Sequence, residues 1–287
     1  MEWERVTIAS KSIIDKYCKG RYNSSDLNFT NFIVWSISER IEYREENEIL
    51  YVRGDLDGKE YYFPPLPKEK NENIVEKLSL AFKNILDNKG RILFIPEEIK
   101  NILEDKFIFS ENRDYFDYIY LSESLETLKG RKYAKKKNKI SQFKKLYEYE
   151  VENISRENLK DVKEFQRKWF EMRKDDPMIR KENKGVELLL ENFELLELLG
   201  VVIKVDNKII GYSLGEILNK NMILVHTEKA LPEYRGSYQM INKIFVCYKG
   251  KDKKYINRED DSGIEGLREA KMSYFPEILY KKYELGN

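Results

Sequence analysis

Residues 186–276 carry an order of elements that few folds accommodate. The turn Asp206-Asn207-Lys208 separates two runs of β-favouring residues, which predicts a β-hairpin. The expected elements are a helix ending at Gly200, strands at 201–205, 209–216 and 222–230, a helix at 239–248, a strand at 255–257 and a helix that stops before Pro276. This order predicts an α+β (mixed α/β) fold, in which helices flank a mixed, mostly antiparallel sheet.

The segment that leads into the last helix is dense in charge. Ser262 and Glu265 have the spacing of a capping box, in which each side chain bonds the backbone N–H of the other residue. Gly263 and Gly266 then fall in the first turn, where glycine permits close approach of a neighbour. We interpret this segment as part of a functional site, and a solvated helix terminus is the alternative.

The order of elements resembles the GCN5-related N-acyltransferase fold. In that fold, the loop after the central strand holds a diphosphate at a helix N-terminus. Its usual pattern is Arg or Gln, two residues, Gly, one residue, then Gly or Ala. Here Arg235 and Gly236 supply one Arg-Gly pair, but Tyr238 or Gln239 would crowd a bound diphosphate. This departure disfavours ordinary coenzyme A binding.

Five segments of the chain resemble one bacterial family, related to the C-terminal domain of phosphatidylglycerol lysyltransferases. These segments are residues 25–35, 226–230, 233–239, 257–260 and 266–274. The resemblance runs over nearly the whole chain and implies two tandem N-acyltransferase-like domains. Lipid-modifying relatives move an aminoacyl group from aminoacyl-tRNA to a phospholipid hydroxyl, whereas the resemblance implies no particular reaction for the plain members of the family.

The N-terminal half is expected to be a degraded copy of the same plan. Residues 49–63 predict a hairpin, residues 72–86 a helix with apolar residues at helical spacing, and residues 91–95, 107–109 and 115–120 further strands. This half has no Arg-Gly turn, so we expect it to shape the structure or the substrate. The predicted domains are residues 1–128 and residues 129–287, and the second holds the active site.

A basic helix is predicted to open the second domain, over residues 129–147. Nine basic residues and no acidic one lie between Lys129 and Lys145, while Tyr133, Ile140, Phe143 and Tyr147 form an apolar stripe. The helix is a candidate contact for the phosphates of tRNA or for an anionic lipid surface. The candidate contact residues are Lys132, Lys135, Lys136 and Lys139. The alternative is an interdomain helix with solvated lysines.

Acyl transfer requires a base for the nucleophile and an acid for the leaving group. Strand alternation over residues 222–230 places Leu224, His226 and Glu228 on one face, so either His226 or Glu228 is a candidate base. The alternatives are a hydrogen-bonded interior histidine and a structural partner for Arg258 or Lys271. Tyr274 is a candidate leaving-group acid by its place in the fold, and a core tyrosine is the alternative.

Other polar residues of the same segments are candidates for substrate binding. Besides Arg235 and Gly236 they are Asn257, Arg258, Glu259, Asp260, Arg268 and Lys271. The cationic members suit a phosphate or a carboxylate. Glu259 or Asp260 is a candidate for holding the amino group of an aminoacyl substrate. A lone histidine and two distant cysteines predict no metal site.

Composition places few limits on the partner. The 287 residues are 41% hydrophobic and 36% charged, yet the net charge is only +1, so any attraction for an anionic partner must be local. We expect a cytoplasmic protein with no membrane-spanning segment and no certain cofactor. The leading hypothesis is an aminoacyltransferase that uses aminoacyl-tRNA and a lipid or small amine or hydroxyl acceptor. The alternatives are an acyl-CoA-dependent N-acetyltransferase and a non-catalytic binding module.

Overall fold

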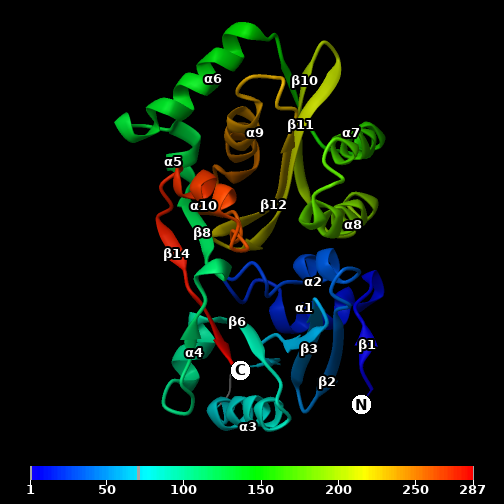
Figure 1. The fold of residues 1–287 in the computed structure, drawn as a ribbon, viewed down its shortest axis with the longest axis vertical. Helices are drawn as coiled ribbons and strands as arrows, with labels where there is room; N and C mark the ends of the chain where they lie inside the picture. The colour runs from blue at the N-terminus through cyan, green and yellow to red at the C-terminus, as the bar shows by residue number, and fades with distance from the viewer. Residues whose placement is uncertain (1, 70–71, 287) are drawn as a thin grey trace. The chain divides into compact units, whose positions relative to one another are not determined.

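The computed structural model describes residues 2–69 and 72–286. The chain forms two compact units, each built around one sheet (Figure 1). Among the described residues, unit 1 comprises 2–117, 260–268 and 279–286, and unit 2 comprises 118–259 and 269–278. The two mixed sheets with flanking helices are the predicted fold class, as the comparisons below confirm.

The sheet of unit 1 has the strand order β1-β2-β3-β4-β6-β15-β7, and β5 pairs with β3. Its strands are β1 (Glu4–Arg5), β2 (Glu42–Glu46), β3 (Ile49–Leu56), β4 (Lys59–Tyr62), β5 (Leu66–Pro67), β6 (Ile92–Pro96), β7 (Ser110–Glu111) and β15 (Lys282–Leu285). Helices α1 (Lys11–Cys18), α2 (Phe29–Trp35), α3 (Ile74–Asp87) and α4 (Glu97–Leu103) accompany it. Phe63 packs against Phe32 and Phe94, with ring centroids 4.9 and 5.4 Å apart, which ties α2 to the sheet.

The sheet of unit 2 has the strand order β14-β8-β13-β12-β11-β10-β9. Its strands are β8 (Asp117–Leu121), β9 (Glu150–Asn153), β10 (Leu199–Val205), β11 (Lys208–Asn219), β12 (Met222–Ala230), β13 (Tyr255–Asn257) and β14 (Ile278–Tyr280). The predicted hairpin is present as β10 and β11. The helices are α5 (Ser122–Thr127), α6 (Ala134–Leu146), α7 (Leu159–Glu171), α8 (Pro177–Glu191), α9 (Ser237–Phe245) and α10 (Glu265–Met272), the last of which begins in unit 1.

Helices cover both faces of the second sheet. Figure 1 shows α9 on one side of β10–β12 and α7 and α8 on the other. Phe165 of α7 packs edge-on against Tyr212 of β11, with 5.8 Å between ring centroids. Of the predicted apolar stripe, Tyr133 just before α6 and Ile140 and Phe143 on α6 are buried, whereas Tyr147 just after it is half-buried. The central strands are therefore shielded from water on both faces.

Each sheet takes one strand from across the predicted domain boundary. Strand β8 pairs with β13 in the second sheet, and β15 pairs with β6 and β7 in the first. Strand pairing depends on contacts far apart in the sequence, so local patterns do not reveal this exchange. The boundary between residues 128 and 129 stays a prediction.

A β-bulge interrupts β12 at His226. Leu214 lies opposite Thr227 and the next residue, Gly215, lies opposite Val225, so His226 is the extra residue. Neighbouring residues of β11 face opposite sides of the sheet, and the bulge therefore reverses the alternation along β12. The expectation that Leu224 and Glu228 share a face is wrong for this reason.

Other local expectations also differ from the structure. No strand forms at 107–109. Gly200 does not end a helix but already belongs to strand β10. The capping box does not form, because the Ser262 hydroxyl donates to Asp260 and α10 begins only at Glu265. Gly263 has a φ of +73°, and a Cβ there would lie 3.0 Å from the Asp114 carboxylate, which explains the glycine.

The bulge region predicts a strong effect of one added methyl group. A Cβ at Gly215 would lie 2.3 Å from the Leu224 carbonyl oxygen and 2.8 Å from the Phe245 ring. We expect Gly215→Ala to force β11 and β12 apart and to destabilise unit 2 by about 1–3 kcal/mol. Thermal unfolding measures this loss. Gly266→Ala, where the added Cβ meets nothing within 4 Å, is the control. An equal effect of the two substitutions would contradict the packing argument.

Candidate functional site

Glu228 and Arg258 form the centre of the polar cluster in unit 2. Glu228 lies on β12, and Arg258 follows β13 directly. The Arg258 guanidinium donates through Nη2 to Glu228 Oε2, and Asn242 of α9 donates to the other carboxylate oxygen at 3.0 Å. Burial alone would lower the pKa of Arg258, but Glu228 outweighs burial and raises it. The guanidinium therefore stays charged, and Glu228 is already committed as its partner.

Tyr274 follows α10 and packs on this pair. Its ring centroid lies 5.1 Å from the Arg258 guanidinium and 4.1 Å from Lys136 Nζ. Burial raises the pKa of the Tyr274 hydroxyl to about 12, although Arg258 opposes the shift. Among the described residues, none hydrogen-bonds this hydroxyl. Tyr274 is thus a neutral phenol that can donate its proton to a ligand.

His226 is held between two carboxylates. Its Nε2 lies 3.0 Å from Glu216 and its Nδ1 lies 2.9 Å from Glu259, while only 3% of the side chain is exposed. Burial alone would lower the pKa of His226, but the two carboxylates outweigh it and raise the pKa to about 9. Near neutral pH the ring is therefore an imidazolium that donates from both nitrogens. Such a ring has no free lone pair with which to accept a proton.

The Arg-Gly turn precedes α9, and Gly236 is its N-cap residue with a φ of +89°. A Cβ at Gly236 would lie 2.4 Å from the backbone oxygen of Lys139, so α6 approaches this turn closely. The backbone N–H of Arg235 donates to the Tyr147 hydroxyl at 3.2 Å, and that of Ser237 donates to the Tyr234 carbonyl. The turn is thus covered by its own unit.

Asn257 and Lys271 shape the chain around Arg258. The Asn257 side chain accepts from the Glu259 N–H at 2.8 Å, and Lys271 Nζ donates to the Arg258 carbonyl at 2.6 Å. Lys271 is buried, and it also lies over the Tyr118 ring. These contacts favour a positioning role for both residues.

The four candidate lysines at α6 differ in their surroundings. Lys135 and Lys139 are exposed, and Lys132 is exposed but lies over the Tyr133 and Phe275 rings. Only Lys136 of the four is half-buried. Burial and the nearby Arg258 lower the pKa of Lys136.

The two remaining predicted residues, Asp260 and Arg268, lie in unit 1. Arg268 donates to both carboxylate oxygens of Asp261, at 2.9 and 2.7 Å, and to Asp114 at 2.6 Å. These hydrogen bonds raise the pKa of Arg268. Its charge is already neutralised within unit 1, which weakens its candidacy for binding phosphate.

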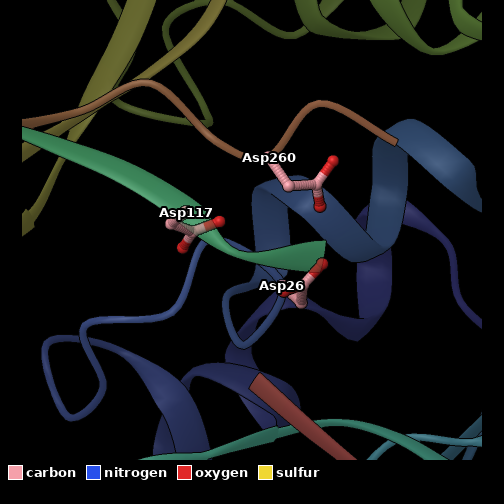
Figure 2. A group of neighbouring side chains, drawn as sticks. All are labelled: Asp26, Asp117 and Asp260. Atoms are coloured by element: carbon pink, nitrogen blue, oxygen red, sulfur yellow. The ribbon is translucent and has the colours of Figure 1, made fainter. Parts of the chain in front are cut away.

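Asp260 belongs to a cluster of three aspartates that surround one lysine, Lys282. Figure 2 shows Asp26 before α2, Asp117 on β8 and Asp260 in the loop after β13. Lys282 Nζ lies 2.7 Å from Asp117 and 3.7 Å from Asp260, and it also pairs with Asp26. The three carboxylates are close enough to share a metal ion, but the Lys282 ammonium already lies among them. We therefore interpret the group as a buried ion cluster.

Sequence patterns did not predict Asp26, Asp117 or Lys282 as site residues. Asp26 falls in the segment 25–35, which the family resemblance marks, so a signal for it was present. Asp117 and Lys282 carry no local pattern, and only the pairing of β15 into the first sheet brings Lys282 to the aspartates. Burial raises the pKa of Asp26 to about 7, against the lowering by Lys282.

The ion cluster predicts that one lysine of β15 is essential for stability. Lys282→Met leaves three carboxylates without their cation, so we expect a loss of about 3–5 kcal/mol in the free energy of unfolding. The neighbour Lys281 is 47% exposed and pairs with an exposed glutamate, so Lys281→Met is the matched control and should cost far less. Denaturant unfolding of both variants makes the comparison. Similar losses would show that the cluster is not a stabilising unit.

The His226 imidazolium predicts a loss of stability on the alkaline side. Its pKa is higher in the folded protein, about 9, than the ordinary value of 6.5. Its contribution is therefore complete below about pH 6.5 and disappears as pH rises through 9. We expect the melting temperature of the wild type to fall over this window and that of His226→Gln to fall less. Melting curves at several pH values measure the difference, and parallel curves would refute the assignment.

Comparisons with known proteins found one family model and several similar proteins. The family model "Phosphatidylglycerol lysyltransferase, C-terminal" matches residues 20–285. A conserved protein of unknown function from Bacteroides thetaiotaomicron is 29% identical, with a TM-score of 0.86 over 99% of this chain and 98% of that one. An uncharacterized protein of Mycoplasmoides gallisepticum, MYCGA3080, is 27% identical over 172 residues, 58% of this chain and 54% of that protein. The match spans about half the length of this curated relative.

Two solved structures share the fold at low identity. L-PGS from Bacillus licheniformis is 14% identical, with a TM-score of 0.65 over 99% of this chain and 93% of that one. FemX is 10% identical, with a TM-score of 0.54 over 99% and 97% of the two chains. These likenesses confirm the two mixed sheets flanked by helices. By the extent of the family match, the chain belongs to the family of the phosphatidylglycerol lysyltransferase C-terminal domain.

Proposed function

We propose that the chain is an aminoacyltransferase that takes its aminoacyl group from aminoacyl-tRNA and passes it to a hydroxyl or amine acceptor. Membership of a family that is named for lysyl transfer supports an aminoacyl group as the cargo. No described helix has both the length and the hydrophobicity needed to cross a bilayer. For the acceptor, we propose a lipid or a small molecule with a free hydroxyl or amine.

The close cover of the Arg-Gly turn by α6 is the observation that favours an aminoacyl-tRNA donor over acyl-CoA. In acyl-CoA enzymes of this fold, the diphosphate binds to free backbone N–H groups at the corresponding turn. Here the Lys139 carbonyl oxygen would lie only 2.4 Å from a Cβ at Gly236, and the Arg235 N–H already donates to the Tyr147 hydroxyl. A diphosphate would have to displace α6. This favours a donor that is held elsewhere.

The charge of α6 supports an RNA donor. Its exposed lysines, Lys135, Lys137, Lys139, Lys144 and Lys145, have no acidic neighbour within the helix. Clustered exposed cations gain affinity for a phosphate backbone by releasing counterions. An RNA bound along α6 would thus contact the same helix that would obstruct a coenzyme A diphosphate.

Tyr274 supplies the proton chemistry that the reaction needs. The acceptor attacks the ester carbonyl, the bond from the carbonyl carbon to the ribose oxygen breaks, and the leaving oxygen needs a proton. In the proposed mechanism the Tyr274 hydroxyl donates this proton and then recovers one from the attacking acceptor. Arg258, held by Glu228, stabilises the transient phenolate. Glu228 is therefore assigned a positioning role.

This mechanism predicts a large effect of a single oxygen atom. Tyr274→Phe keeps the ring on Arg258 but removes the proton donor, so we expect transfer to slow by about 100-fold without a change in melting temperature. The assay follows a labelled amino acid from a set of charged tRNAs to phosphatidylglycerol vesicles and to small amines. Tyr248→Phe, at a tyrosine that is 52% exposed, is the control.

The same assay separates the alternatives. Transfer from acetyl-CoA to an amine, with none from charged tRNA, would replace the proposal by an N-acetyltransferase. No transfer and no change in melting temperature with either donor would favour a non-catalytic binding module.

A further inference from the structure

Lys136 differs from every other lysine of α6. Lys135, Lys137, Lys139, Lys144 and Lys145 are exposed, whereas Lys136 is half-buried with its ammonium on the Tyr274 ring. Within the described residues, its ammonium has no hydrogen-bond acceptor and no carboxylate partner. Removing an ammonium from water without such a partner is costly, and the aromatic ring compensates for only part of the cost.

A second cation increases this cost. The Arg258 guanidinium lies on the same ring and repels Lys136, and together with burial it lowers the pKa of the Lys136 ammonium. Glu228 is the carboxylate that neutralises Arg258, and its two oxygens are already used by Arg258 and Asn242. The Nη1 atom of Arg258 is buried and has no hydrogen-bond partner. The surroundings of Tyr274 thus contain more positive charge and more donors than the described residues satisfy.

We propose that Lys136, supported by Arg258, binds a phosphate group of a ligand beside the Tyr274 ring. A phosphate carries enough negative charge and enough acceptor oxygens for an ammonium and a guanidinium together. Lys136 makes the contact from the more exposed side, and Arg258 adds its charge from the buried side.

The site also has a consequence for orientation. A phosphate fixed beside the Tyr274 ring would bring the atoms next to it in the ligand close to the proposed proton donor. The phosphate site itself stands on the contacts above, and only the identity of its carrier rests on the proposed function. Under that function the carrier is a nucleotide near the aminoacylated end of the RNA. A lipid headgroup phosphate has the same chemistry, so the experiment must distinguish the two.

The test is a titration of the full chain with three probes: inorganic phosphate, adenosine 5′-monophosphate and sn-glycerol 3-phosphate. Binding is followed by amide shifts in NMR, which report weak affinities. We expect Lys136→Met, which keeps the apolar stem, to weaken binding of the preferred probe by about 10-fold, the effect of one charge-assisted hydrogen bond. Lys136→Arg should retain most of the affinity. Lys160→Met, at an exposed lysine of α7 rather than α6, should bind like the wild type.

Each outcome decides the proposal. Tighter binding of the nucleotide than of the glycerol ester supports the site with a nucleic-acid carrier, and the reverse order supports it with a lipid carrier. Equal affinity of Lys136→Met and the wild type, or no binding of any probe by the wild type, overturns it. A third outcome is that Lys136→Met loses phosphate binding while the wild type shows no transfer from charged tRNA. This outcome would support the phosphate site and contradict the proposed function.

Discussion

Buried positive charges, and the carboxylates that neutralise them, are the constraint on which both units depend. Lys282 needs three aspartates from separate segments, Arg258 needs Glu228, and the His226 ring lies between two glutamates. Each cation would be too costly to bury alone, so its partners must be held in place by the sheets that carry them. The polar clusters therefore depend on the strand pairings, because the pairings hold each carboxylate beside its cation. A change that releases one partner leaves a charge inside the protein.

Local patterns predicted much of this architecture. The hairpin of β10 and β11, the helix α3 and the apolar stripe of α6 follow from turn residues and periodicity, which are short-range signals. The exchange of β8 and β15 between the two sheets and the bulge at His226 depend on which strands pair, and no local pattern encodes that choice. The same reason explains why Lys282 was not anticipated although Asp260 was.

The candidate site shows a similar division. The family resemblance marked Glu228, Arg258 and Tyr274, and the structure brings these three residues together in unit 2. Their chemical roles stay predictions. Some cationic side chains are available to a ligand, and others are already neutralised by carboxylates. Residue type alone does not distinguish the two kinds. Arg268, with its two aspartate partners, belongs to the second kind, and its partner Asp114 is distant in the sequence.

The position of β15 has a consequence for biosynthesis. Most of unit 1, residues 2–117, precedes unit 2 in the sequence, yet its sheet is completed only by residues 282–285. Until these residues emerge, Asp26 and Asp117 lack their counter-ion and the exposed edge of β6 lacks its neighbour. The first sheet therefore stays incomplete while unit 2 is translated, a period in which chaperones have the opportunity to bind the nascent chain.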